Sequence, residues 1–169
     1  MLEQITTEIK PLLAANLRQI LSRVDDQILA AVEEIRLRVN QPLILNLHQR
    51  EVLITAQGRT TENYQAAYQT TKADINESIN LMTNSSLYAL EEELKEGYLT
   101  LPGGHRVGFV GEVLANDNQI ELIKNFSGLN IRLSTAVIGA ADSIIHQIIK
   151  GCSSIYNTLV ISPPQCGKT

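Results

Sequence analysis

The stretch Glu34-Ile35-Arg36-Leu37-Arg38-Val39 alternates strictly between charged and apolar residues. Successive side chains of a β-strand point to opposite faces, so this order places the three aliphatic residues on one face. Two more apolar runs follow after short polar turns, from Leu43 to Leu47 and from Glu51 to Ile54. Strands this short and this close together in sequence predict an antiparallel β-meander.

Upstream of this stretch, the apolar residues follow a helical period instead. Their spacings of three and four predict one buried helical face, interrupted by Pro11, which is suited to the first position of a second helical segment. Asp25 is a good N-cap for a short helix that follows. The apolar face consists of Ile5, Ile9, Leu12, Leu13, Leu17, Ile20, Leu21 and Val24.

Downstream of the meander, a polar stretch from Gln57 to Thr71 predicts a loop. Thr71 or Asp74 is suited to cap the helix that comes next, because a short polar side chain can accept a backbone N–H at a helix start. A further helix is predicted from Tyr88 to Glu96, with Gly97 as its C-cap.

The following section of the chain has the pattern of strands and tight turns. Tyr98 to Leu101 predicts a short strand, and Pro102 to Gly104 predicts a turn. His105 to Leu114 predicts a strand whose internal glycines indicate a bulge or the close approach of another group. Two more strands are predicted, from Ile120 to Ile123 and from Leu129 to Leu133.

Two domains of different type follow from these patterns. The helices and antiparallel hairpins of residues 1–136 predict an N-terminal α+β domain. In residues 137–169, Gly139 to Lys150 has the apolar spacing of a helix, and Tyr156 to Ile161 is an apolar, β-branched run of strand type. Helix, strand and then a phosphate-binding loop are the opening of a parallel α/β sheet.

The chain ends in that phosphate-binding loop. Its form is the P-loop (Walker A) pattern G-x-x-x-x-G-K-[ST], with Ser162 in the place of the first glycine. Backbone N–H groups of such a loop wrap the phosphates of ATP, Lys168 reaches the outer phosphates, and the Thr169 hydroxyl holds Mg²⁺. The predicted nucleotide-binding residues are Ser162, Pro163, Pro164, Gln165, Cys166, Gly167, Lys168 and Thr169.

No helix follows Thr169, although a P-loop site gains part of its anion affinity from the N-terminus of the next helix. No acidic strand that could hold Mg²⁺ follows either. We therefore expect this chain to be the front part of an ATPase, cut where the catalytic domain begins. The chain alone is expected to be inactive, and the intact protein to use ATP and Mg²⁺.

Charge and composition exclude several classes of protein. A formal net charge of −4 gives no broad basic field, so nucleic acid is not an expected partner. No apolar run approaches the ~20 residues that a membrane-spanning helix needs, and the N-terminus lacks the features of a secretory signal. Two cysteines are too few for a disulfide framework or a metal site. These features predict a cytoplasmic protein without a transmembrane segment.

Three strings carry a family resemblance: Glu33 to Arg38, the glycine-rich segment from Tyr98 to Gly108, and Pro163 to Thr169. Together they resemble the stage III sporulation AA family, the ATPases of the channel complex that joins mother cell and forespore. The resemblance covers nearly the whole chain. That family is similar to the secretion ATPases of type II and type IV systems, which are AAA-type hexameric motors with an N-terminal domain ahead of a RecA-like core.

The resemblance implies a truncated RecA-like domain at residues 137–169 and a homo-hexamer in the intact protein. It also implies membrane-embedded components of the sporulation channel as partners, and a place on the mother-cell side, peripheral to that complex. In secretion ATPases, arginines from late N-domain strands face the nucleotide, and the patterns around Arg106 and Arg132 are similar to these. With Lys168, the two arginines are thus implied to be catalytic, because a guanidinium can stabilise the charge of a transferring phosphoryl group.

Structural alternatives stay open for each of these residues. Arg106 and Arg132 could be ordinary strand-end arginines bonded to nearby carboxylates. Arg36 and Arg38 could form cross-strand charge pairs on a solvated face or lie at a subunit interface. His105 is expected to be a turn histidine rather than a ligand. The alternative function is a non-enzymatic adaptor that docks onto a membrane complex.

Overall fold

A computed structural model shows two compact units, Met1–Ser134 and Thr135–Thr169. The first unit combines helices with an antiparallel sheet, so the predicted α+β class is confirmed. The boundary predicted between residues 136 and 137 falls outside the part of the chain that the structure describes. The described residues are 2–48, 50–83, 97–116, 119–134, 139–151 and 154–161.

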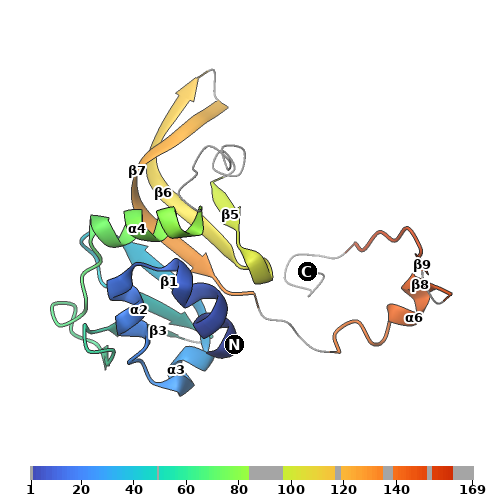
Figure 1. Ribbon diagram of the computed structural model, residues 1–169, viewed down its shortest axis with the longest axis horizontal. Coiled ribbons are helices and arrows are strands. Elements are labelled where there is room, and N and C mark those ends of the chain that lie inside the picture. The colour runs from blue at the N-terminus through green and yellow to red at the C-terminus, as the bar shows by residue number, and fades with distance from the viewer. Residues whose placement is uncertain are drawn as a thin grey trace. The chain divides into compact units, whose positions relative to one another are not determined.

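A seven-stranded antiparallel sheet forms the body of the first unit, in the order β4-β3-β2-β1-β7-β6-β5 (Figure 1). β1, which contains the alternating stretch, lies in the middle of the sheet between β2 and β7. β1, β2 and β3 pair as antiparallel neighbours, which confirms the predicted meander. The strands are β1 (Val32–Arg38), β2 (Ile44–Leu47), β3 (Arg50–Ile54), β4 (Thr60–Thr61), β5 (Tyr98–Thr100), β6 (Arg106–Asn116) and β7 (Gln119–Arg132).

Helices cover one face of this sheet, and Figure 1 shows α2 and α4 lying across it. The core lies between the two layers, where Leu17 of α2, Ile35 of β1 and Ile75 of α4 are at most 1% exposed. Burial of such aliphatic side chains is the main force that holds a helical layer on a sheet. The helices are α1 (Leu2–Gln4), the π-helix η1 (Ile5–Ile9), the 3₁₀-helix η2 (Lys10–Leu12), α2 (Ala15–Leu21), α3 (Asp26–Ala30) and α4 (Lys72–Met82).

The N-terminal helices follow the predicted apolar face with different breaks. Pro11 lies in η2, near the start of that short helix, and α2 itself begins only at Ala15. A proline near a helix start is tolerated because the N–H it lacks would have no intrahelical partner there. Asp25 caps α3 as predicted, since its carboxylate accepts the Gln27 N–H at 2.8 Å.

Thr71 and Asp74 both cap α4, in a reciprocal capping box. Asp74 is 1% exposed, and its Oδ2 accepts the backbone N–H of Thr71 at 2.9 Å and the hydroxyl of Tyr68 at 2.7 Å. Burial, together with this hydrogen bond, raises the pKa of Tyr68 to about 12. The buried carboxylate thus binds both the start of α4 and the preceding Tyr68. The helix predicted from Tyr88 to Glu96 lies outside the described residues.

β6 and β7 form a long hairpin that extends past the other strands (Figure 1). The prediction of two separate strands, Ile120 to Ile123 and Leu129 to Leu133, is wrong, because both runs fall on the single strand β7. The residues between them bend the strand without ending it, and Asn125 has a φ of 50°. The pairing register shifts at Gly111, where a Cβ would lie 2.7 Å from the Lys124 carbonyl oxygen. This is the close approach that a glycine inside a strand predicts.

The second unit differs from its sequence-based prediction. Gly139 to Lys150 was expected to be helical, but only α6 (Ile145–Ile148) is, and the chain then enters β8 (Ile149–Lys150). β8 pairs with β9 (Ser154–Ile155) in a small hairpin. A short helix is stable only when other elements pack against it, and Ile144 and Ile145 remain 42% exposed.

The strand predicted from Tyr156 to Ile161 is also absent. A strand forms only beside a hydrogen-bonded neighbour, and of these residues Tyr156 alone has a described backbone–backbone hydrogen bond, to the Ile148 carbonyl oxygen at 2.8 Å. Leu159 and Ile161 are 83% and 84% exposed. The parallel sheet and the RecA-like start therefore remain predictions. Within the described ranges, no helix is long and apolar enough to cross a membrane.

Candidate functional site

The predicted P-loop, from Ser162 to Thr169, falls outside the described residues. The roles of Lys168 toward ATP and of Thr169 toward Mg²⁺ therefore remain predictions. The candidate site that the structure does describe lies in the first unit, around Arg106 and Arg132.

Arg106 and Arg132 occupy directly opposed positions on β6 and β7. Arg132 is in turn opposite Glu34 on β1, and Glu34 is opposite Asn46 on β2. Residues opposite each other in a sheet point to the same face. One strand neighbour of each belongs to the buried core: Val107, Ile131, Ile35 and Leu45. The polar row therefore lies on the face that the described helices leave uncovered.

The two arginines line one pocket of about 290 Å³, together with Tyr98, Gly108 and Asn130. The guanidinium carbon of Arg106 lies 5.8 Å from the centre of the Tyr98 ring, a cation–π distance. A Cβ at Gly108 would project into open space, with no atom closer than 3.9 Å. A glycine at this position therefore leaves the pocket unfilled. Two positively charged guanidinium groups line the pocket, so it suits a negatively charged ligand.

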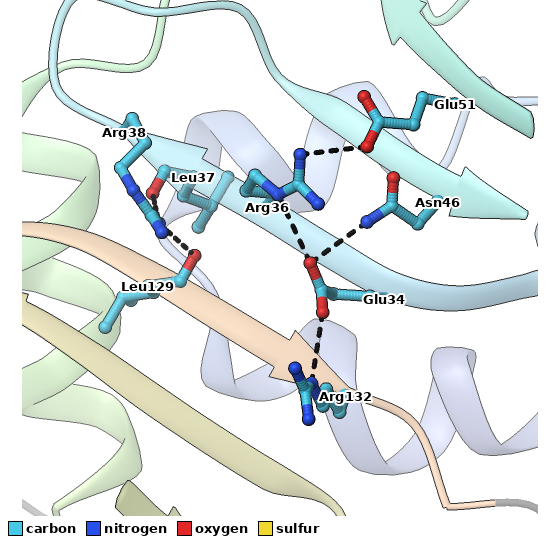
Figure 2. A network of polar contacts seen from close by, with 8 residues as sticks. All are labelled: Glu34, Arg36, Leu37, Arg38, Asn46, Glu51, Leu129 and Arg132. Atoms are coloured by element: carbon cyan, nitrogen blue, oxygen red, sulfur yellow. Dashed lines mark hydrogen bonds and ion pairs between the residues drawn. The ribbon is translucent and has the colours of Figure 1, made fainter. Parts of the chain in front are cut away.

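Glu34 connects the pocket to the centre of the sheet (Figure 2). Its Oε1 accepts hydrogen bonds from Arg36 Nε at 3.2 Å and from Asn46 Nδ2 at 3.0 Å. Its Oε2 accepts from Arg132 Nε at 3.2 Å. The Glu34 side chain is only 13% exposed, whereas that of Arg132 is 73% exposed. Arg132 is thus tethered at one nitrogen while most of its side chain faces solvent.

Arg36 forms one ion pair within β1, with Glu34, and one cross-strand charge pair, the kind that was one of its two predicted roles. Besides Glu34, it bonds Glu51 on β3, with Nη1 3.0 Å from the carboxylate oxygen. Both partners lie on strands of the same sheet, so these contacts stabilise the open face. The alternative role of Arg36 and Arg38 at a subunit interface remains a prediction.

Arg38 is used within its own sheet. Its Nη1 donates to the carbonyl oxygens of Leu37 at 2.8 Å and Leu129 at 3.2 Å (Figure 2). Burial lowers the pKa of Arg38, and the neighbouring positive charge of Arg36 lowers it further. Gly128 makes room for this side chain, because a Cβ there would lie 2.5 Å from Arg38 Cδ.

His105 is fully buried beside the turn from Pro102 to Gly104. Its Nδ1 accepts the backbone N–H of Ser134 at 2.9 Å, so in the neutral ring the proton sits on Nε2. Nε2 lies 2.6 Å from the carboxylate of Glu8. A Cβ at Gly103 would come within 2.3 Å of that carboxylate. His105 is therefore structural, which agrees with its expected role at a turn.

Three pocket-related residues were not singled out from the sequence: Tyr98, Asn130 and Glu34. Glu34 lies on the charged face of the alternating stretch, and the register of β1 against β7 brings it to Arg132. The alternation of charged and apolar residues shows on which face of the sheet a side chain lies. It does not show which residue of a distant strand lies opposite, because the pairing register of such strands has no local sequence signal. Among the described residues, no group of three or more His, Cys, Asp or Glu side chains is placed to hold a metal ion.

Comparison with known proteins gives a consistent match. A family model described as "Sporulation stage III, protein AA" matches residues 3–169. The chain is similar to the stage III sporulation protein AA of Bacillus subtilis (strain 168), with 33% identity over 162 residues. The alignment covers 96% of this chain and 48% of the relative, so the chain spans about half of the relative's length. No solved structure matches the chain.

Proposed function

Because this chain belongs to the sporulation stage III protein AA family, we propose that it is the N-terminal part of a sporulation ATPase. The intact protein would hydrolyse ATP and so power or assemble the channel between mother cell and forespore. It would act as a homo-hexamer on the mother-cell side, peripheral to membrane-embedded channel components. The chain alone is proposed to be inactive.

The observation that carries this proposal is the paired placement of Arg106 and Arg132. Like charges directly opposite each other in a sheet destabilise it, yet these two positions are both arginine. Such a loss of sheet stability is expected at a functional site, where charged side chains are needed for function. Both line the same hollow, and two guanidinium groups at one place match the several oxygens of a phosphate.

The proposed division of work follows the chemistry of each group. Residues Ser162 to Thr169 would bind the phosphates of ATP through backbone N–H groups, with Lys168 at the outer phosphates. Thr169 would hold Mg²⁺, which neutralises phosphate charge when it is bound. Arg106 and Arg132 would act in trans, on nucleotide held by a neighbouring subunit of the ring. Their fixed positive charge would stabilise the charge of the transferring phosphoryl group.

The test is the ATPase rate of an intact protein that extends over the full length of its relatives. We expect Arg106→Ala and Arg132→Ala to lower the rate by roughly a thousandfold, since arginines in this role have effects of that order. Lys168→Ala should abolish the activity. Arg59→Ala removes an exposed arginine near the far edge of the sheet and should leave the rate unchanged. A normal rate in both pocket variants, with a lowered melting temperature, would assign the arginines to the fold instead.

A second candidate is the non-enzymatic adaptor that docks onto a membrane complex. The observation that favours it is an exposed aliphatic residue on each face of the β6–β7 hairpin, where Val113 is 50% and Leu114 is 42% exposed. Exposed aliphatic residues on an extended hairpin are typical of a protein contact. An intact protein without any ATPase activity, but with binding to channel components that Val113→Asp abolishes, would support this candidate.

A further inference from the structure

We infer that Glu34 is a positioning residue that aims the guanidinium of Arg132 at a phosphate group in the pocket. This inference rests on the proposed function of that pocket. Glu34 lies on β1 and does not line the pocket itself, so any effect it has on a ligand acts through Arg132. Neither the family resemblance nor the alternation of the strand assigns it this role.

The first argument is that Glu34 is itself fixed. Its carboxylate is mostly buried, and two donors from neighbouring positions, Arg36 and Asn46, hold one of its oxygens. The other oxygen receives Arg132 (Figure 2). A long side chain that is 73% exposed would otherwise sample many rotamers. A tether to a fixed carboxylate removes part of that entropy cost before a ligand arrives.

The second argument is which nitrogen of Arg132 is tethered. The contact uses Nε alone, and within the described residues the two terminal nitrogens bond no protein group. A two-point pair between Arg132 and Glu34 would have occupied at least one of the terminal nitrogens. The observed geometry leaves them available for two oxygens of one phosphate group. Arg106, directly opposite, offers a second guanidinium to the same ligand.

A different role for Glu34 predicts the opposite result. If Glu34 only neutralised charge, removing its negative charge would strengthen the binding of anions, as Coulomb's law requires. If Glu34 positions Arg132, the same removal weakens binding. Glu34→Gln distinguishes the positioning role from the charge-neutralising role. Glutamine keeps the shape of the side chain but replaces one acceptor oxygen by an NH₂ donor group. Oε1 of Glu34 accepts from two donors and Oε2 only from Arg132, so the glutamine keeps its oxygen toward Arg36 and Asn46 and loses the contact with Arg132.

The experiment titrates tripolyphosphate into the 169-residue chain with Lys168→Ala, which removes the P-loop lysine as a competing site. NMR of arginine Nε–Hε groups reports both affinity and the state of Arg132. We expect Glu34→Gln to weaken binding about fivefold and to remove the hydrogen-bonded Nε–Hε signal of Arg132. The matched control is Glu51→Gln, an equal change of charge on the same sheet, at a carboxylate that contacts Arg36 and not Arg132. Its affinity should not fall.

Unchanged or tighter binding in Glu34→Gln overturns the positioning role. The proposed function still stands in that case if Arg106→Ala and Arg132→Ala bind tripolyphosphate weakly. If these two alanine variants bind as well as the parent chain, or if the parent chain does not bind, the pocket has no phosphate role and both proposals fall. Should Glu34→Gln not fold, Glu34→Asp decides, because it keeps the negative charge but is one methylene shorter, so its carboxylate no longer reaches Arg132 Nε from the same backbone position. A loss of tripolyphosphate affinity of about fivefold in this variant supports the positioning role, and an unchanged affinity overturns it.

Discussion

At the scale of single residues, His105 joins segments that are far apart in the sequence. Its ring contacts the carboxylate of Glu8 in η1 and the backbone N–H of Ser134 after β7. We predict that His105→Ala lowers the free energy of unfolding by about 3 kcal/mol, because it removes a buried ring and leaves the Ser134 N–H without an acceptor. Urea denaturation of the two proteins measures the difference.

The control for this prediction is the other histidine with a carboxylate partner. His48 contacts Glu33 on the protein surface, and its side chain is 82% exposed. The hydrogen bond to Glu33 raises the pKa of His48, but an exposed pair contributes little to stability. His48→Ala should leave the urea midpoint unchanged. Equal losses at the two positions would contradict the importance of burial at His105.

At the scale of elements, β6 and β7 each contain a glycine that leaves space for a different purpose. Gly108 leaves the pocket open, and a Cβ there meets nothing closer than 3.9 Å. We predict that Gly108→Val leaves the stability of the sheet intact, since valine favours strands, and weakens tripolyphosphate binding by filling the pocket. Binding titration combined with thermal melting tests both parts.

Gly128→Ala is the matched change on the partner strand. Its Cβ would lie 2.5 Å from Arg38 Cδ and 2.8 Å from the Leu37 carbonyl oxygen. We expect a loss of about 1–3 kcal/mol in stability, because the backbone of β1 cannot move away without disturbing the sheet. A loss of stability in Gly108→Val would contradict the open space at Gly108. An unchanged stability in Gly128→Ala would contradict the close contact at Gly128.

The elements that sequence patterns predicted well are those whose signal is local. Alternation in β1 reports which side chains face the core, and the short polar side chain of Thr71 or Asp74 reports a helix start. The break predicted within β7 was wrong because polar residues near Asn125 bend the strand but keep its pairing with β6. The helix predicted from Gly139 to Lys150 was wrong because an apolar face forms a stable helix only where something packs on it.

The candidate site shows the same limit. Arg106 and Arg132 were identified from short patterns, and the structure brings them together at opposed positions. The hydrogen bond of Arg132 to Glu34 depends on a pairing between strands that are nearly a hundred residues apart, and no local pattern encodes it. The catalytic role of the two arginines and the nucleotide role of residues 162–169 stay predictions.

At the scale of the whole molecule, the first unit contains the entire buried core found among the described residues. We predict that a chain ending at Ser134 folds and has the same urea midpoint as the 169-residue chain. Circular dichroism during denaturation measures both. A lower midpoint for the shorter chain would show that residues 135–169 contribute to the stability of the first unit.

The last residue of that unit is fixed at both of its backbone polar groups. The Ser134 N–H bonds His105, and its carbonyl oxygen accepts the side-chain amide of Gln4 at 3.4 Å. Ser134 therefore anchors the end of the first unit to the N-terminal helices and to the residue that follows the glycine turn. Arg132 lies two residues before this anchor, so the contacts of Ser134 also restrain the backbone that carries this pocket arginine.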